Sequence, residues 1–378
     1  MSTQEFADLQ LFITGPTYIR PEIREAGLLP EFGHRDSENV KRFGPAMAGL
    51  KELAGCGEDF HVILFNGSGS NAMEATVRSL VADDETVLNV SVGAFGDLYH
   101  KMAVVNGKKA VQLKFEAGQA IDMGKLEAAL VEHKPACVTF THNETSTGVM
   151  NDMQAICKLI RKHGALPLVD GVSIFGGAKL DLSTSGAATY ATSTQKSLAL
   201  PAGFGILFAT PEAIEKAKTV KNKGFATDIV GQLGRASKNQ TLTTPNTTLA
   251  NQMAVQIDYI LHTEGIANRF ARHLKMQAMV HDFVASLPGF ELLAPAGHRS
   301  PTVTAVRVPA GMSVAQLKKV KEAMRAKGYL FDPGYGKLNT DLEEKGQRVL
   351  LRLGHMGDVT PEMLEAYLEA LKPELLNN

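Results

Sequence analysis

Short apolar runs alternate with amphipathic stretches along the first two thirds of the chain. The apolar runs predict buried strands at His61–Phe65, Thr86–Val92, Val111–Phe115, Ala136–Thr141, Leu166–Val169 and Gly205–Phe208. Between them, Ala72–Val81 and Met153–His163 place apolar residues at helical spacing. Continuous apolar strands that alternate with helices are typical of a parallel sheet covered on both faces. This part of the chain therefore predicts an α/β fold.

The pattern changes in the last third of the chain. The spacing over Leu249–Leu287 predicts one or two long helices, and Pro301–Pro309 alternates like a half-buried strand. A helix is expected at Val314–Lys327, a strand at Val349–Leu353 and a helix at Pro361–Leu371. A chain of 378 residues exceeds the ~250–300 residues at which a single core stops growing. We predict an N-terminal arm (1–20) that packs on either domain, a large domain (21–262) and a smaller α+β domain (263–378).

Composition narrows the classes of protein. Hydrophobic residues make up 44% of the chain, and the net charge of -1 provides no global attraction for nucleic acid or membrane. The three cysteines form no CxxC pair, so neither a disulfide framework nor a metal site is predicted. Met1–Leu11 lacks the apolar core of a signal peptide, and no apolar run approaches ~18 residues. We therefore expect a cytoplasmic protein.

A glycine-rich turn, Gly67–Asn71, joins a predicted strand to a predicted helix. The free N–H groups of a helix N-terminus bind phosphate, but a plain tight turn or a capping box between Asn71 and Glu74 is equally consistent with this sequence. The spacing also fits the dinucleotide pattern G-x-G-x-x-A, although Asn89 and Ser91 stand where that site needs an acidic residue. The Gly-Lys-Ser/Thr ending of a P-loop is missing.

Asp170 and Lys196 are the candidate reactive groups. Asp170 follows a predicted strand, at the edge of the sheet where α/β proteins bind ligands, yet a lone Asp there is more often a turn former. Lys196 is the only charged residue between Leu182 and Phe208, and a lone lysine is more often a solvated loop residue. Taken together with the glycine-rich turn, Asp170 and Lys196 favour a cofactor site over these separate explanations. Pyridoxal phosphate (PLP) needs a lysine for its Schiff base, a carboxylate on its ring nitrogen and a phosphate cup.

The chain resembles the class V aminotransferases of fold type I, in the alanine–glyoxylate and serine–pyruvate branch. The resemblance extends from Thr14 to about Leu371 and rests on TGPT (14–17), GHRD (33–36), GSGSNAMEA (67–75), GAFG (93–96), HNETSTGV (142–149), VDGVS (169–173), STQKSL (193–198) and LRLGHMG (351–357). It implies a large domain with a mostly parallel seven-stranded sheet and a smaller C-terminal α+β domain. It also implies transfer of an amino group from alanine or serine to glyoxylate or pyruvate by a ping-pong mechanism.

The same resemblance implies roles for individual residues. Lys196 would form the Schiff base and move the proton, and Asp170 would bind the ring nitrogen. Phe95 would stack on the ring, although a plain core position is its alternative. Arg352 would bind the substrate carboxylate near Gly15. The other implied cofactor contacts are Ser68, Gly69, Ser70, Thr145, Val172, Gln195 and, from the neighbouring subunit of a homodimer, Thr243.

Departures from the family pattern affect the phosphate and substrate contacts. Val92, Leu98, Gln240 and Ala202 stand where relatives often have Asn, Arg, Tyr and Pro. No cysteine follows Lys196, which disfavours a desulfurase. A 2-aminoethylphosphonate–pyruvate transaminase stays open as the alternative, and a nicotinamide-dependent dehydrogenase is a distant one. A binding module without activity is disfavoured because Lys196, Asp170 and Arg352 are all present.

Overall fold

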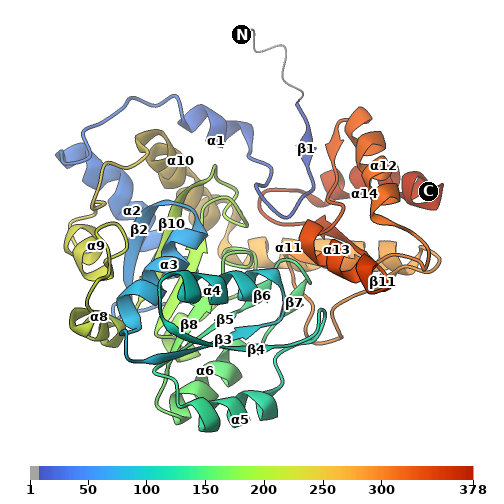
Figure 1. Cartoon of the computed structure of the whole chain (residues 1–378). Coiled ribbons are helices and arrows are strands. Elements are labelled where there is room, and N and C mark those ends of the chain that lie inside the picture. The colour runs from blue at the N-terminus through green and yellow to red at the C-terminus, as the bar shows by residue number, and fades with distance from the viewer. Residues whose placement is uncertain (1–7, 378) are drawn as a thin grey trace.

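The computed structural model describes residues 8–377, and its centre is a seven-stranded sheet (Figure 1). Only β10 runs antiparallel to its neighbours in this sheet, so the predicted mostly parallel α/β architecture is confirmed. In their order across the sheet, the strands are β2 (His61–Gly67), β10 (Gly203–Ala209), β9 (Thr189–Ser193), β8 (Leu166–Asp170), β5 (Cys137–Thr141), β3 (Thr86–Ser91) and β4 (Lys109–Lys114).

Helices and a small hairpin surround this sheet. The hairpin pairs β6 (Asn143–Glu144) with β7 (Val149–Met150). The helices are α1 (Pro21–Ala26), α2 (Ser37–Leu53), α3 (Gly69–Leu80), α4 (Ala94–Val105), α5 (Met123–His133), α6 (Met153–Lys162), α7 (Leu182–Ser185), α8 (Pro211–Thr219), α9 (Ile229–Ala236) and α10 (Thr247–Asp258).

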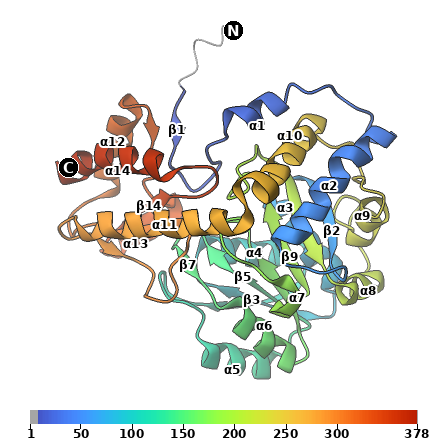
Figure 2. The ribbon, with the colours of Figure 1, turned by 180° about the vertical axis from the view of Figure 1, so that it is seen from behind.

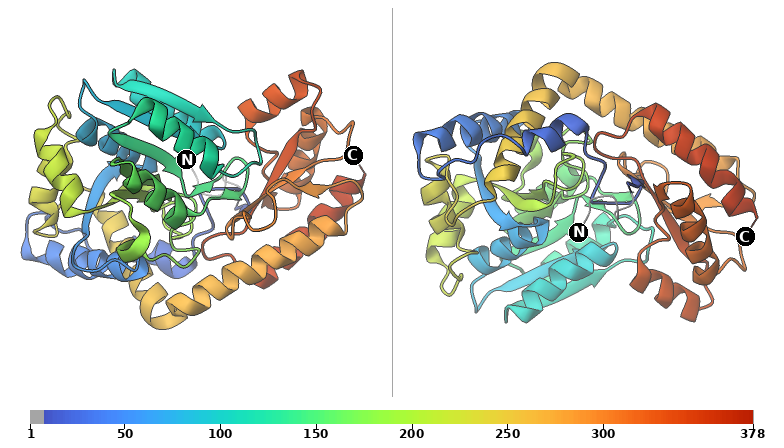
Figure 3. Two further views of the ribbon diagram at one scale, coloured as in Figure 1. Left: turned by 90° about the horizontal axis from the view of Figure 1, so that it is seen from below. Right: turned by 90° about the horizontal axis from the view of Figure 1, so that it is seen from above.

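The C-terminal part stands beside the sheet, and the long helix α11 runs along both parts (Figures 2 and 3). An antiparallel sheet in the order β11-β12-β14 carries the helices of this part. Its elements are α11 (Ile266–Ala285), β11 (Glu291–Leu292), β12 (Val303–Arg307), α12 (Val314–Ala326), β13 (Tyr329–Leu330), α13 (Gly336–Glu344), β14 (Leu350–Gly354) and α14 (Pro361–Leu376).

Buried apolar side chains form two main clusters that follow this division. One joins the large sheet to its helices, and the other is built from α11, α12, α14, β12 and β14. The N-terminal arm contacts both clusters: β1 (Gln10–Leu11) pairs with β13 and Phe12 stacks on Tyr367 of the second cluster, while Ile19 packs against the first. Residues 1–7 lie outside the described residues. The domain boundary at residue 262 stays a prediction.

The structure corrects two local expectations and adds detail to a third. The capping box of α3 joins Ser68 to Asn71, not Asn71 to Glu74, because the helix begins at Gly69. The segment expected as one or two long helices contains a π-helical turn, η2 (Tyr259–Glu264), between α10 and α11. The pattern of apolar runs missed β9, whose buried positions are largely Thr, Ser and Ala. Within residues 8–377 no helix has the length and apolar character needed to cross a membrane.

Candidate active site

The parallel strands of the large sheet end at one edge, and the predicted site residues gather there. Ser68 directly follows β2, and Asp170 is the last residue of β8. Phe95, Thr145 and Lys196 lie in the segments that follow β3, β5 and β9. Residues far apart in the sequence therefore meet at the position where α/β sheets bind ligands.

Asp170 offers a buried carboxylate to this edge. Its residue is 3% exposed, and its Oδ1 accepts a hydrogen bond from Val172 N at 2.8 Å. The pKa of Asp170 is raised to about 7, chiefly by burial and in part by the nearby Glu144 carboxylate, against the opposing effects of the Val172 N–H and Lys196. A partner with an N–H or a positive charge stabilises the charged form of such a buried carboxylate. The protonated nitrogen of a pyridine ring is a partner of this kind.

Lys196 presents its amine at the same edge. Its Nζ donates a hydrogen bond to Thr14 O, from the N-terminal arm. Burial lowers the pKa of Lys196 to about 8, and Arg352 lowers it further, against the opposing effect of Asp332 and Asp170. The neutral amine, which is the nucleophile and the base, is thus present as about a tenth of the population at pH 7, far more than for an ordinary lysine.

Gly15 lies directly against this amine. A Cβ at Gly15 would fall 2.5 Å from Lys196 Nζ, and the backbone there has a φ of +110°. Any other residue would therefore meet backbone strain and would displace the end of the lysine side chain. A glycine at this position lets the arm approach the amine closely.

The first turn of α3 forms the candidate phosphate cup. Gly69 and Ser70 occupy the first helical positions, where backbone N–H groups have no partner within the helix. Gly69 packs closely on Val172, since a Cβ at Gly69 would lie 2.4 Å from Val172 Cγ2. The phosphate cup and the Asp170 loop are therefore in direct contact.

Two polar side chains near this cup have buried atoms without a partner. Gln195 Oε1 and Ser193 Oγ make no hydrogen bond among the described residues. Ser193 faces Gly69, where a Cβ would lie 3.4 Å from Ser193 Cβ. Buried polar atoms are rarely left unpaired, so both are suited to a polar ligand at this site. A glycine cradle, helix N–H groups, a buried carboxylate and a lysine amine together fit PLP.

Phe95 lies beside this site, on a well-anchored turn. Glu144 accepts hydrogen bonds from Phe95 N at 3.1 Å and from Gly96 N at 3.1 Å, which fixes the start of α4. The Phe95 ring is partly exposed, and its centroid lies 6.0 Å from that of Tyr335, which comes from the C-terminal part. A partly exposed ring at this edge is available to a cofactor ring, although its stacking role stays a prediction.

Arg352 reaches the site from β14. Its Nη2 lies 3.0 Å from Asp332 Oδ2, and its Nη1 donates to Thr145 O at 3.3 Å. Its buried Nε has no partner among the described residues. An anionic partner was expected for this arginine, and within the chain that partner is Asp332. Thr145 contributes its backbone oxygen here; its contact with the cofactor stays a prediction.

Thr243, which was predicted to contact the cofactor from the neighbouring subunit, lies beside Asn66 within the chain. It is exposed, and its Oγ1 accepts a hydrogen bond from Asn66 Nδ2 at 2.8 Å. Thr243 does not cap the helix that follows it, because Asn246 caps α10. Among the departures, Val92 is fully buried and Gln240 accepts a hydrogen bond from Arg35.

Sequence reasoning missed Thr14, Ser193, Asp332 and Tyr335 as site residues. The motif TGPT contained Thr14, but nothing local indicated that its carbonyl oxygen meets Lys196. Asp332 and Tyr335 belong to the loop between β13 and α13, which the packing of the C-terminal part places against β14. No local sequence signal indicates that packing.

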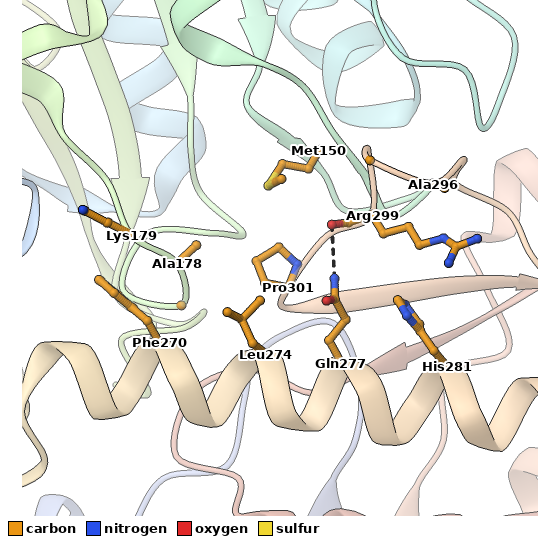
Figure 4. Close-up of a pocket in the computed structure, with 12 residues that line it drawn as sticks. Met150, Ala178, Lys179, Phe270, Leu274, Gln277, His281, Ala296, Arg299 and Pro301 are labelled. Carbon is orange, nitrogen blue, oxygen red and sulfur yellow. Dashed lines mark hydrogen bonds between the residues drawn. The ribbon is translucent and has the colours of Figure 1, made fainter.

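A separate cavity of about 540 Å³ lies between the two parts of the molecule (Figure 4). Met150, Ala178 and Lys179 line it on one side, and Phe270 and Leu274 of α11 line it on the other. None of its lining residues is a predicted site residue. The chemistry of the strand ends, rather than cavity size, therefore locates the candidate active site.

Comparison with known proteins agrees with this geometry. The family described as Aminotransferase class-V matches residues 33–326. The chain is 30% identical to a serine–glyoxylate aminotransferase of Hyphomicrobium methylovorum over 97% of this chain and 90% of that protein. It is 29% identical to an L-aspartate–glyoxylate aminotransferase of Paracoccus denitrificans, covering 93% of this chain and 87% of that protein.

A solved structure extends the similarity to the fold. The alanine–glyoxylate aminotransferase from Nostoc sp. superposes with a TM-score of 0.89 at 25% sequence identity, covering 99% of this chain and 97% of that one.

Proposed function

Because this chain belongs to the class-V aminotransferases and uses PLP as its cofactor, we propose that it moves the amino group of alanine or serine to glyoxylate or pyruvate. One observation carries the proposal. A buried carboxylate at Asp170 and a lysine with a lowered pKa at Lys196 share an edge of the sheet with the arginine Arg352. The named relatives that act on serine and alanine support the choice of small amino acids.

Each site residue has a separate role in the proposed reaction. When bound, PLP supplies an electron sink for the bond that breaks at the substrate Cα. Asp170 would hold the proton on the ring nitrogen, and Gly69 and Ser70 would bind the phosphate. The Lys196 amine would take the proton from Cα, which suits a group whose pKa is about 8. Arg352 would orient the substrate through its carboxylate.

We further propose two separate half-reactions, in which the first product leaves before the second substrate binds. Double-reciprocal plots at several acceptor concentrations should then give parallel lines. Intersecting lines would contradict this part of the proposal.

An absorption spectrum tests the central role of Lys196. The purified protein with PLP should absorb near ~410–430 nm, and alanine or serine should shift this band towards ~330 nm. Lys196→Ala should lose the band and reduce amino transfer by at least about a thousandfold, because the residue both binds the cofactor and moves the proton. Lys179→Ala, which removes an exposed lysine, is the matched control and should behave like the unchanged protein.

The outcome that contradicts this role is a Lys196→Ala protein that keeps the band and the activity. The alternative substrate is examined in the same assay. Faster turnover with 2-aminoethylphosphonate than with alanine or serine would replace the proposed donors with that compound.

A further inference from the structure

Asp332 is held entirely by groups of the protein. Besides Arg352, its carboxylate accepts hydrogen bonds from Thr14 Oγ1 at 3.1 Å, Thr14 N at 3.4 Å and Gly334 N at 3.0 Å. Its residue is only 5% exposed. A carboxylate accepts about four hydrogen bonds, so these donors occupy the oxygens of Asp332. The side chain is therefore a fixed negative charge and not a ligand for the substrate.

This charge lies directly against the arginine expected to bind the substrate. Asp332 Oδ1 and Oδ2 lie 3.3 Å and 3.0 Å from Arg352 Nη2, and Thr145 O holds Nη1. The guanidinium is thus fixed on two sides, while its Nε has no partner among the described residues. It keeps N–H groups for one carboxylate, but the pair has no net charge with which to attract a second.

We propose that Asp332 is a positioning residue that makes this site select substrates with a single carboxylate and reject those with a second anionic group. The proposal rests on the aminotransferase function and names the substrate class of that same site. A second carboxylate or a phosphonate close to Arg352 meets the Asp332 anion where little water screens the repulsion. A single carboxylate can still use the N–H groups that Arg352 keeps free, such as Nε.

The loop that carries Asp332 cannot move aside easily. A Cβ at Gly334, where φ is +95°, would lie 2.2 Å from Leu350 O, so the loop packs tightly on β14. Tyr335 follows, with its ring centroid 5.8 Å from the Arg352 guanidinium and 6.0 Å from the Phe95 ring. Its ring therefore lies near both residues, on the same loop as Asp332.

Binding of two unreactive acids of equal chain length, butyrate and succinate, tests the charge selection. Dissociation constants are measured by calorimetry on the full chain loaded with PLP. The unchanged protein should bind butyrate at least about tenfold more tightly than succinate, and Asp332→Asn should reduce this ratio by about tenfold. Asp332→Glu should keep the ratio because it keeps the charge. Asp341→Asn, an exposed position on α13, is the matched control and should leave the ratio unchanged.

Two results would overturn the proposal. One is equally tight binding of succinate and butyrate by the unchanged protein, a measurement that needs no variant to fold. The other is an unchanged ratio in a folded Asp332→Asn protein. Failure of the proposed function is distinguishable, because it appears as absent amino transfer from alanine and serine while the binding ratio still follows the prediction.

Discussion

Burial shifts the pKa values of the two candidate reactive side chains in opposite directions. The pKa of the Asp170 carboxyl is raised to about 7 and that of the Lys196 amine is lowered to about 8, so each shift favours the neutral form. Such shifts are common where groups await a charged ligand. In the protein without cofactor, the burial of these two groups lowers the free energy of unfolding, because both would be charged in water at neutral pH.

The dependence of stability on pH that follows from such a shift can be tested at Asp170. A carboxyl whose pKa is raised on folding adds stability at low pH and loses it as the pH rises through about 7. Asp170→Asn should therefore stabilise the cofactor-free protein at pH 8, by roughly 1–3 kcal/mol, and clearly less at pH 5. Melting temperatures at both pH values measure this, with the exposed Asp84→Asn as control. A variant that is less stable than the unchanged protein at pH 8 would refute the prediction.

At the scale of elements, α11 fixes the segment that carries the lysine. Arg269 of α11 is fully buried and donates to Ser197 O at 2.5 Å and to Gly176 O at 2.9 Å. Its Nη1 also pairs with Asp358 at 2.9 Å and Glu264 at 2.6 Å. One guanidinium therefore joins the loop after β9, the loop after β8 and the segment after β14.

Removal of Arg269 should lower the stability of the folded chain. Arg269→Met leaves buried carboxylates and carbonyl groups without their donor, so we expect a loss of about 3–5 kcal/mol in the free energy of unfolding. Urea unfolding measures the loss. Lys275→Met, an exposed position on the same helix, should change it little. The prediction is wrong if both variants unfold at the same urea concentration.

At the scale of the whole molecule, the site combines groups from three regions. The large sheet supplies Asp170 and Lys196, the C-terminal part supplies Arg352, and the N-terminal arm supplies Thr14. We propose that a fourth contribution, Thr243, comes from the partner in a homodimer. Within one chain Thr243 bonds to Asn66, close to its own phosphate cup, so a contribution to the same chain's site is the competing arrangement.

Hybrid dimers separate these two arrangements. Thr243→Val alone should weaken PLP binding about ten- to a hundredfold, as expected for the loss of a hydrogen bond to a charged group. Coexpression with a Lys196→Ala chain should restore one normal site per dimer, because Lys196 and Thr243 then come from different chains. Activity and PLP affinity of the purified hybrid measure this recovery. A hybrid without recovery, or a protein that sediments as a monomer, would contradict the shared site.

Much of the fold could be predicted from local pattern. The strands with continuous apolar runs, such as β2 and β5, were found within one or two residues at each end, because burial on both faces of a parallel sheet demands such runs. The strand β9 was missed because Thr189, Thr192 and Ser193 are buried without being apolar. Their burial follows from the central place of β9 in the sheet, which no local pattern records.

The sequence by itself predicted the candidate reactive residues and the chemistry that they imply. A lysine, an aspartate and a glycine-rich turn at strand ends are local features, and parallel strands bring their ends together by topology alone. Only the tertiary structure decided which groups surround these residues and how their pKa values are shifted. The contact of Thr14 with Lys196 and the approach of Tyr335 to Phe95 join segments more than a hundred residues apart, and the pairing of Asp332 with Arg352 joins the two sides of α13. Such contacts depend on how the elements pack, and burial in that packing shifts the pKa values of the site.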